Sequence, residues 1–217
     1  MSRLSQITKA ARKQSLDVFG VLAANSADPV PVGTKTIVLL GPNEPGFWPH
    51  FTAEPEYNDQ MPDPIDRWSS RVISQLAADM GGAAIFPFGG PPYAPFIDWA
   101  LRCGRVWSSP VSLLVHDTAG LLVSFRGAIA LPCALTLAEA APSPCDTCSD
   151  QPCLSVCPVG ALSVAGYDLM SCHDYLDTTP GRDCMDAACM VRCACPVSQA
   201  YGRLAVQSAH HMKAFHK

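Results

Sequence analysis

Apolar residues in the N-terminal third recur at intervals that predict two helices with a strand between them. Residues 4–22 carry apolar side chains at helical spacing, with basic residues among them, which predicts one amphipathic helix. The stretch 35–42, KTIVLLGP, is short and rich in β-branched residues, as buried strands are. Helical spacing returns in 65–80, where Asp63 suits the N-cap and Pro64 the first helical position.

The next part of the chain predicts a strand, a helix and a hairpin. The strand AAIFPF occupies 83–88, and a helix spans 95–103 before Gly104. Residues 111–117 and 121–131 are apolar on either side of a Thr-Ala-Gly turn, which predicts a β-hairpin with a long second arm. The alternation of elements favours an α+β fold, a mixed sheet with flanking helices.

Residues 42–64 interrupt this alternation, because they are rich in proline, aromatic and acidic residues. They predict a long irregular loop, and such loops in compact domains are either functional or disordered. Its aromatic residues either line a ligand site or cover the neighbouring core, and the second interpretation is favoured. These residues are Trp48, His50, Phe51 and Tyr57.

Cysteine dominates the pattern after residue 140. Nine of the 11 cysteines lie between Cys145 and Pro196. Gaps of four and then three residues separate Cys148, Cys153 and Cys157, and the same gaps separate Cys184, Cys189 and Cys193. Each triplet has one more cysteine before it, Cys145 and Cys172. Two sets of four thiols are enough for two metal centres.

The sequence after Cys157, Pro-Val-Gly-Ala-Leu, resembles the segment around the fourth cysteine of bacterial ferredoxins. In the two-cluster ferredoxins, the last cysteine of each run binds the other cluster. The resemblance implies two [4Fe-4S] clusters and a crossed set of ligands. One cluster would be held by Cys145, Cys148, Cys153 and Cys193, and the other by Cys172, Cys184, Cys189 and Cys157. Cys195, which precedes Pro196, is the alternative to Cys193.

Two other interpretations of the cysteines stay open. Structural zinc commonly uses two separated C-x2-C knuckles, and here only Cys145 and Cys148 form one. A disulfide framework is typical of secreted proteins, and the sequence shows no signal-peptide pattern. The spacing favours iron–sulfur clusters over both.

A longer segment resembles a known family. Residues 95–201 contain, in order, a predicted helix, the Gly-x-x-Trp turn at 104–107, SLLVHDTAG, RGAIAL and the cysteine-rich region, in which SCHDYLDT carries Cys172. This order resembles the epoxyqueuosine reductases and reductive dehalogenases. The resemblance implies a nitroreductase-like domain of the cobalamin-processing type, followed by a ferredoxin-like module that supplies electrons to a corrinoid. We therefore expect a domain over 1–140, the module over 141–200 and a helical tail over 201–217.

Charge narrows the choice of partners. The formal net charge of −4 and the pI near 5.8 argue against a nucleic-acid or membrane-surface binder. The chain has no apolar run of 18 residues, so we expect a cytoplasmic protein. Between 139 and 196 eight acidic residues outnumber two arginines. Negative charge beside a cluster disfavours reduction, which predicts low-potential electron transfer and docking of a basic redox partner protein.

Two classes of function follow from the sequence. The first is an iron–sulfur electron-transfer protein, and the alternative is a corrinoid-dependent or corrinoid-handling reductase, an oxidoreductase with a corrinoid or small-molecule acceptor. No catalytic residue is assigned. Tyr93, Asp98, His116 and Asp117 are candidates, and surface or capping roles suit them better.

Overall fold

The computed structural model describes residues 2–137 and 139–216. The chain is a mixed α+β protein that divides into two compact units. The first, called here the sheet unit, is Met1–Arg105 with Ser124–Ala141. The second, the cysteine unit, is Val106–Val123 with Pro142–Lys217. The units divide after residues 105, 123 and 141, so 106–123 lie with the cysteines and not with the preceding domain.

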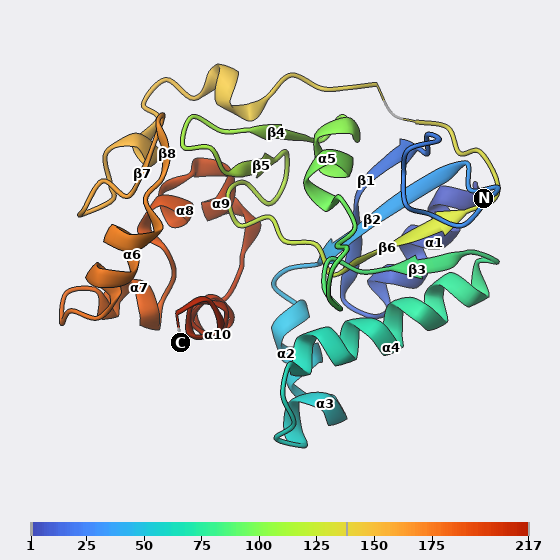
Figure 1. The fold of residues 1–217 in the computed structure, drawn as a ribbon, viewed down its shortest axis with the longest axis horizontal. Coiled ribbons are helices and arrows are strands. Elements are labelled where there is room, and N and C mark those ends of the chain that lie inside the picture. Colours follow the sequence, from blue (N-terminus) through green and yellow to red (C-terminus); the bar gives the residue numbers. More distant parts are fainter. Residues whose placement is uncertain (1, 138, 217) are drawn as a thin grey trace. The chain divides into compact units, whose positions relative to one another are not determined.

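A four-stranded sheet forms the centre of the sheet unit (Figure 1). Its strands, in spatial order, are β1 (Leu16–Ala23), β2 (Thr36–Pro42), β6 (Gly127–Leu131) and β3 (Ala83–Ile85). All three neighbouring pairs are antiparallel, so the expected mixed sheet is not formed. The physical reason is that β6 pairs with both β2 and β3 and separates two strands that would otherwise make a parallel pair.

Helices cover the sheet and explain its apolar strands. All seven residues of β2 are buried, as its sequence predicts. The helix α4 (Pro64–Asp79) packs on β3 and β6, and α1 (Arg3–Arg12) and α5 (Phe96–Arg102) pack on β1. The prediction for α4 is confirmed, with Asp63 at the N-cap and Pro64 in the first turn. The side chain of Asp63 makes no capping hydrogen bond.

The helix predicted over 4–22 is wrong in its second half. The helix α1 ends at Arg12, and Leu16 begins β1. Ser15 has a left-handed backbone with φ of 51°, which ends the helical path. The following residues, LDVFGVLA, pair with β2, because the sheet buries their apolar side chains.

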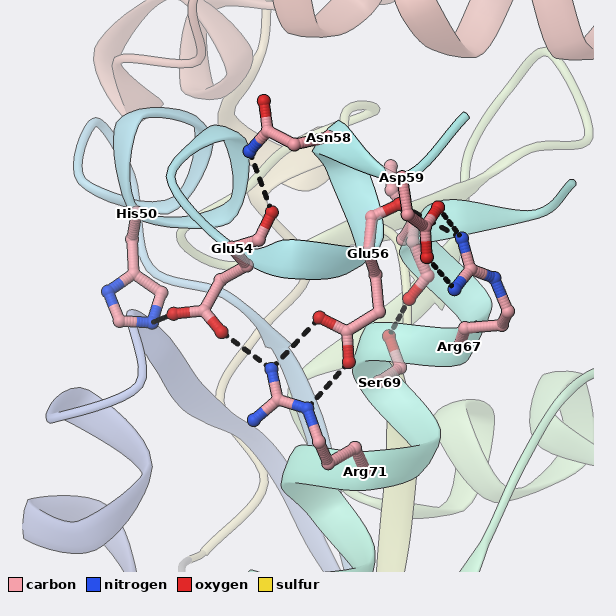
Figure 2. Close-up of polar contacts among 9 residues, drawn as sticks. His50, Glu54, Glu56, Asn58, Asp59, Arg67, Ser69 and Arg71 are labelled. Atoms are coloured by element: carbon pink, nitrogen blue, oxygen red, sulfur yellow. Dashed lines mark hydrogen bonds and ion pairs between the residues drawn. The ribbon is translucent and has the colours of Figure 1, made fainter. Parts of the chain in front are cut away.

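The expected loop over 42–64 also contains regular structure, α2 (Phe47–Thr52) and α3 (Pro55–Asn58). The rings of Phe47 and Phe51 lie 5.4 and 5.9 Å from that of Trp68 on α4, so aromatic side chains cover the core. Figure 2 shows the polar contacts that join α3 to α4 outside this cluster. The Arg71 guanidinium bonds to the carboxylates of Glu54 and Glu56. Arg67 makes two bonds of 2.7 Å to Asp59.

The cysteine unit is built from short elements around a small core (Figure 1). Two small antiparallel sheets are present, β4 (Val106–Ser108) with β5 (Leu114–His116) and β7 (Leu162–Ser163) with β8 (Gly166–Tyr167). The helices are η1 (Pro144–Thr147), η2 (Pro152–Leu154), α6 (Leu169–Leu176), α7 (Arg182–Asp186), α8 (Met190–Ala194), α9 (Pro196–Tyr201) and α10 (Ala205–Phe215). The expected separate tail over 201–217 is not separate, because α10 packs on α7.

The predicted hairpin of 111–117 with 121–131 is reduced to one antiparallel bridge across its turn, between His116 and Gly120. The strand β5 pairs with β4, and the second arm becomes β6 in the other unit. The two arms serve two different cores. Val111, Val115 and Leu121 are buried with Cys153 and Cys195 in the core of the cysteine unit. This explains why 106–123 belong to that unit, since the cysteine-rich segment has few apolar side chains of its own.

Within residues 2–137 and 139–216, none of the helices has both the length and the apolar character that crossing a membrane requires.

Candidate metal centres

Four cysteines of the cysteine unit line one cavity of about 420 Å³. They are Cys145, Cys148, Cys153 and Cys195. Burial raises the pKa of the Cys145 thiol, and the charges of Cys195 and Cys148 raise it further. The pKa of Cys153 is raised by burial and then by Cys145, Cys148 and Cys195. Cys148 and Cys195 therefore lie close enough to Cys145 and Cys153 for their charges to act on these two thiols.

Local turns bring three of these cysteines together. Ser143 begins η1 by accepting a hydrogen bond from the Cys145 backbone N–H, and Pro144 occupies the first turn. The Cys148 N–H bonds to the Cys145 carbonyl at 3.3 Å and ends this turn. The four residues between Cys148 and Cys153 reverse the chain at Gln151, whose φ is 37°, and Pro152 begins η2. The wider gap thus still places Cys153 in the cavity wall.

The fourth wall cysteine comes from the far end of the cysteine-rich segment. Cys195 is buried and is the N-cap of α9, directly before Pro196. Cys193 lies two residues earlier on α8, is exposed, and does not line the cavity. Its charged neighbours are Cys189, Arg203 and Arg192. The structure therefore groups Cys195, and not Cys193, with the first three cysteines.

Four further cysteines, Cys157, Cys172, Cys184 and Cys189, form a second group. Burial raises the pKa of Cys172 on α6, and the charges of Cys189 and Cys157 add to the rise. Burial likewise raises the pKa of Cys184 on α7, with contributions from Cys189, Cys172 and Cys157. Cys189 is the N-cap of α8. This group, Cys157, Cys172, Cys184 and Cys189, has the membership that the ferredoxin resemblance implies.

The cavity of the first group is wider than a single metal ion requires. Across 2–137 and 139–216, no group of three or more His, Cys, Asp or Glu side chains is arranged to hold one metal ion. A cubane asks for a wider arrangement, because each thiolate binds a different iron atom. A water molecule occupies about 30 Å³ in the liquid, so 420 Å³ is ample for an eight-atom cubane. All 11 cysteines are free thiols in the described structure.

Two further side chains lie at the second group, and sequence reasoning did not find them. The Tyr167 hydroxyl donates a hydrogen bond of 3.2 Å to the Cys172 sulfur. Arg192 lies on α8 between Cys189 and Cys193, and its Nη1 donates to the Leu121 carbonyl at 2.6 Å. A tyrosine five residues before a cysteine is no motif by itself, which is why the sequence gave no signal for it.

The candidates for a catalytic role have structural contacts. Asp98 pairs with Arg102 at 2.7 Å, one helical turn away on α5. His116 is fully buried, and its Nδ1 accepts hydrogen bonds from the backbone N–H groups of 118 and 119. Its ring also lies 3.2 Å from the Asp117 carboxylate, while Tyr93 is exposed. These contacts are typical of helix surfaces and tight turns.

No family model matches the sequence, and neither a curated protein nor a solved structure matches it. The support for a function therefore comes from the chain's own residues and from the resemblance of residues 95–201 to the epoxyqueuosine reductases and reductive dehalogenases.

Proposed function

We propose that this is an iron–sulfur electron-transfer protein that binds two [4Fe-4S] clusters. Cys145, Cys148, Cys153 and Cys195 would hold the first cluster, and Cys157, Cys172, Cys184 and Cys189 the second. The observation that carries the proposal is the cavity whose wall contains four cysteines from three separate turns of the chain. Each Cys-Pro cysteine then belongs to the group opposite its own run, as in two-cluster ferredoxins.

The chemistry of the bound clusters would be the uptake and release of single electrons. The chain supplies thiolates to fix the irons and apolar side chains to limit water. Val115 and Leu121 line the cavity and belong to the buried core of the unit. Val191, on α8, is 1% exposed and lies in the same core. Restricted access of water keeps the local dielectric low, so nearby charges act strongly on the potential.

The charge of the cysteine unit supports a low reduction potential. The sequence of the cysteine unit contains eight carboxylates and five basic side chains, whereas that of the sheet unit contains eleven carboxylates and ten basic side chains. An oxidised cubane with four thiolates already carries net negative charge, so added carboxylates disfavour the incoming electron. The donor and acceptor would be one-electron carriers, and a basic donor protein would bind faster at low salt.

Anaerobic purification tests the proposal. We expect about eight irons and about eight sulfides per chain, a broad visible absorbance that dithionite bleaches, and a paramagnetic signal in the reduced protein. Zinc in place of iron, or no metal at all, would contradict the proposal. A refolding trial with iron and sulfide separates a protein that lost its clusters from one that does not bind them.

A corrinoid-handling reductase is the second candidate. What supports it is the resemblance of residues 95–201, of which α5, the turn at Gly104 and β6 form as expected, whereas SLLVHDTAG pairs with β4 in place of the expected second arm. Adding cobalamin to the same anaerobic sample tests it. A changed corrinoid spectrum supports the reductase, and an unchanged one leaves an electron carrier.

A further inference from the structure

Tyr167 closes one side of the second cysteine group. It ends β8, two residues before α6, and its hydroxyl donates to the Cys172 sulfur at 3.2 Å. The Phe215 ring stacks on it, with centroids 6.3 Å apart and planes 14° apart. The ring of Tyr167 is 37% exposed, so the stack holds it in place at the surface.

Arg192 brings a positive charge to the same group. It lies on α8 between Cys189 and Cys193 and is partly buried. Within the described residues it has no carboxylate partner, and its one side-chain hydrogen bond goes to the Leu121 carbonyl. A partly buried guanidinium needs a countercharge. Cys189 and Cys193 flank it on α8 and are the thiols whose charge would act on it, and Arg203 is a second cation nearby.

The first cysteine group has a different electrostatic environment. The groups that act on Cys145 are the Ser143 hydroxyl, the thiols of Cys195 and Cys148, and the carboxylate of Asp146. Those that act on Cys153 are other cysteines and a backbone N–H. Each group thus has one carboxylate among these influences, Asp146 at the first and Asp168 at the second, and the two groups differ in the Tyr167 hydrogen bond and the Arg192 charge at the second.

We infer that Tyr167 and Arg192 raise the reduction potential of the cluster at Cys157, Cys172, Cys184 and Cys189 above that of the other cluster. This inference rests on the proposed function. Reduction adds negative charge, which a hydrogen-bond donor and a nearby cation stabilise and a carboxylate destabilises. An electron supplied by dithionite therefore reduces the second cluster before the first. Tyr167 and Arg192 are positioning residues, because they act on that cluster through its cysteines.

Potentiometric titration with dithionite and mediators, followed by electron paramagnetic resonance, tests this. The wild-type protein should show two separate one-electron steps. Cys172→Ala should remove the step at the higher potential. Tyr167→Phe should make that step about tenfold harder, a shift of about 59 mV for one electron, because a hydrogen bond to a charged group is lost. Arg192→Gln should shift the same step downward, and Arg192→Lys should shift it less.

Tyr175→Phe is the matched control, since Tyr175 lies on α6 and its hydroxyl donates to no cysteine sulfur in the described structure. Its two steps should stay in place. Full iron content with unchanged potentials in Tyr167→Phe would overturn the inference and leave the proposed function standing. Absence of iron from the wild-type protein would overturn the proposed function instead. If Arg192→Gln loses iron, the reduction potentials of Tyr167→Phe alone decide the inference.

Discussion

The buried side chains of the sheet unit differ in kind from those of the cysteine unit. In the sheet unit, Trp68 and Trp99 are fully buried beside a strand that is buried along its whole length. In the cysteine unit, the buried core includes two cysteines and borrows apolar residues from 106–123. The first unit has apolar area enough for a stable core, whereas the second is organised around thiols, and the proposed clusters would supply part of its order.

The polar contacts of the two units also differ. Ion pairs in the sheet unit join elements that already pack, as Arg71 joins α3 to α4 (Figure 2). In the cysteine unit, the Tyr167 hydroxyl donates to the Cys172 sulfur, and Arg192 lies between Cys189 and Cys193 on α8. Charge therefore supports the fold in the sheet unit, and we propose that it adjusts a metal centre in the cysteine unit.

Removal of iron should have the largest effect and should separate the units. After chelation, backbone amides of α6, α7 and α8 should lose protection from hydrogen exchange, while those of β2 and α4 keep theirs, because apolar packing holds the sheet unit. Hydrogen exchange with mass spectrometry of the iron-loaded and chelated protein measures this. Equal loss in both units would show that the sheet unit also depends on metal.

Trp68→Ala should be the most damaging change in the sheet unit. The side chain is fully buried and contacts the rings of Phe47 and Phe51, so its loss should cost about 3–5 kcal/mol of unfolding free energy. Urea unfolding followed by circular dichroism measures the change. Ile97→Ala, at a side chain that is 67% exposed, is the control and should stay within about 0.5 kcal/mol. A drop in the iron content of Trp68→Ala at unchanged unfolding free energy would contradict the division between an apolar sheet unit and a metal-dependent cysteine unit.

Asp28→Asn should have an intermediate effect. The Asp28 side chain is 3% exposed and bonds to Arg102 at 2.8 Å and to the Trp99 indole N–H at 2.9 Å. Loss of its charge should cost about 2–3 kcal/mol. Asp98→Asn removes the more exposed partner of the same arginine and should cost under about 1 kcal/mol. Similar losses in both variants would contradict the role of burial.

The same pair predicts a pH dependence. The hydrogen bond from Arg102 lowers the pKa of Asp28 well below the usual value of about 3.9. Its contribution is therefore complete above the unfolded pKa and is lost as pH falls through the folded pKa. Unfolding free energy of the wild-type protein should fall below about pH 4, and Asp28→Asn should flatten that fall. An equal slope in both proteins would contradict the assignment.

The sequence predicted those elements whose apolar pattern is compatible with only one type of secondary structure. The strand β2 and the helix α4 follow from their periods and end signals. The strand β1 was missed, because residues 16–22 continue the helical spacing and only the turn at Ser15 ends the helix. The hairpin was misplaced, because one apolar segment serves the cysteine core and the next completes the sheet.

The cysteine groups were predicted to a similar degree. Spacing and resemblance pointed to Cys157, Cys172, Cys184 and Cys189 as one set of ligands, which stays a prediction, and the structure adds that the other cysteines of the set raise the pKa of Cys172 and Cys184. For the first group, repetition of the gaps favoured Cys193, whereas the Cys-Pro pair favoured Cys195, and which of the two is buried depends on how α8 ends. Tyr167 and Arg192 depended on side-chain positions that no local pattern records.

Iron and sulfide content of a matched pair of variants tests the central claim most directly. Cys193→Ala should keep about eight irons per chain, because Cys193 is exposed and lies outside the cavity wall. Cys195→Ala should lose about half of the iron and keep the signal of the cluster at Cys172, because the first cluster lacks its fourth thiolate. Full iron in Cys195→Ala together with loss in Cys193→Ala would contradict the account.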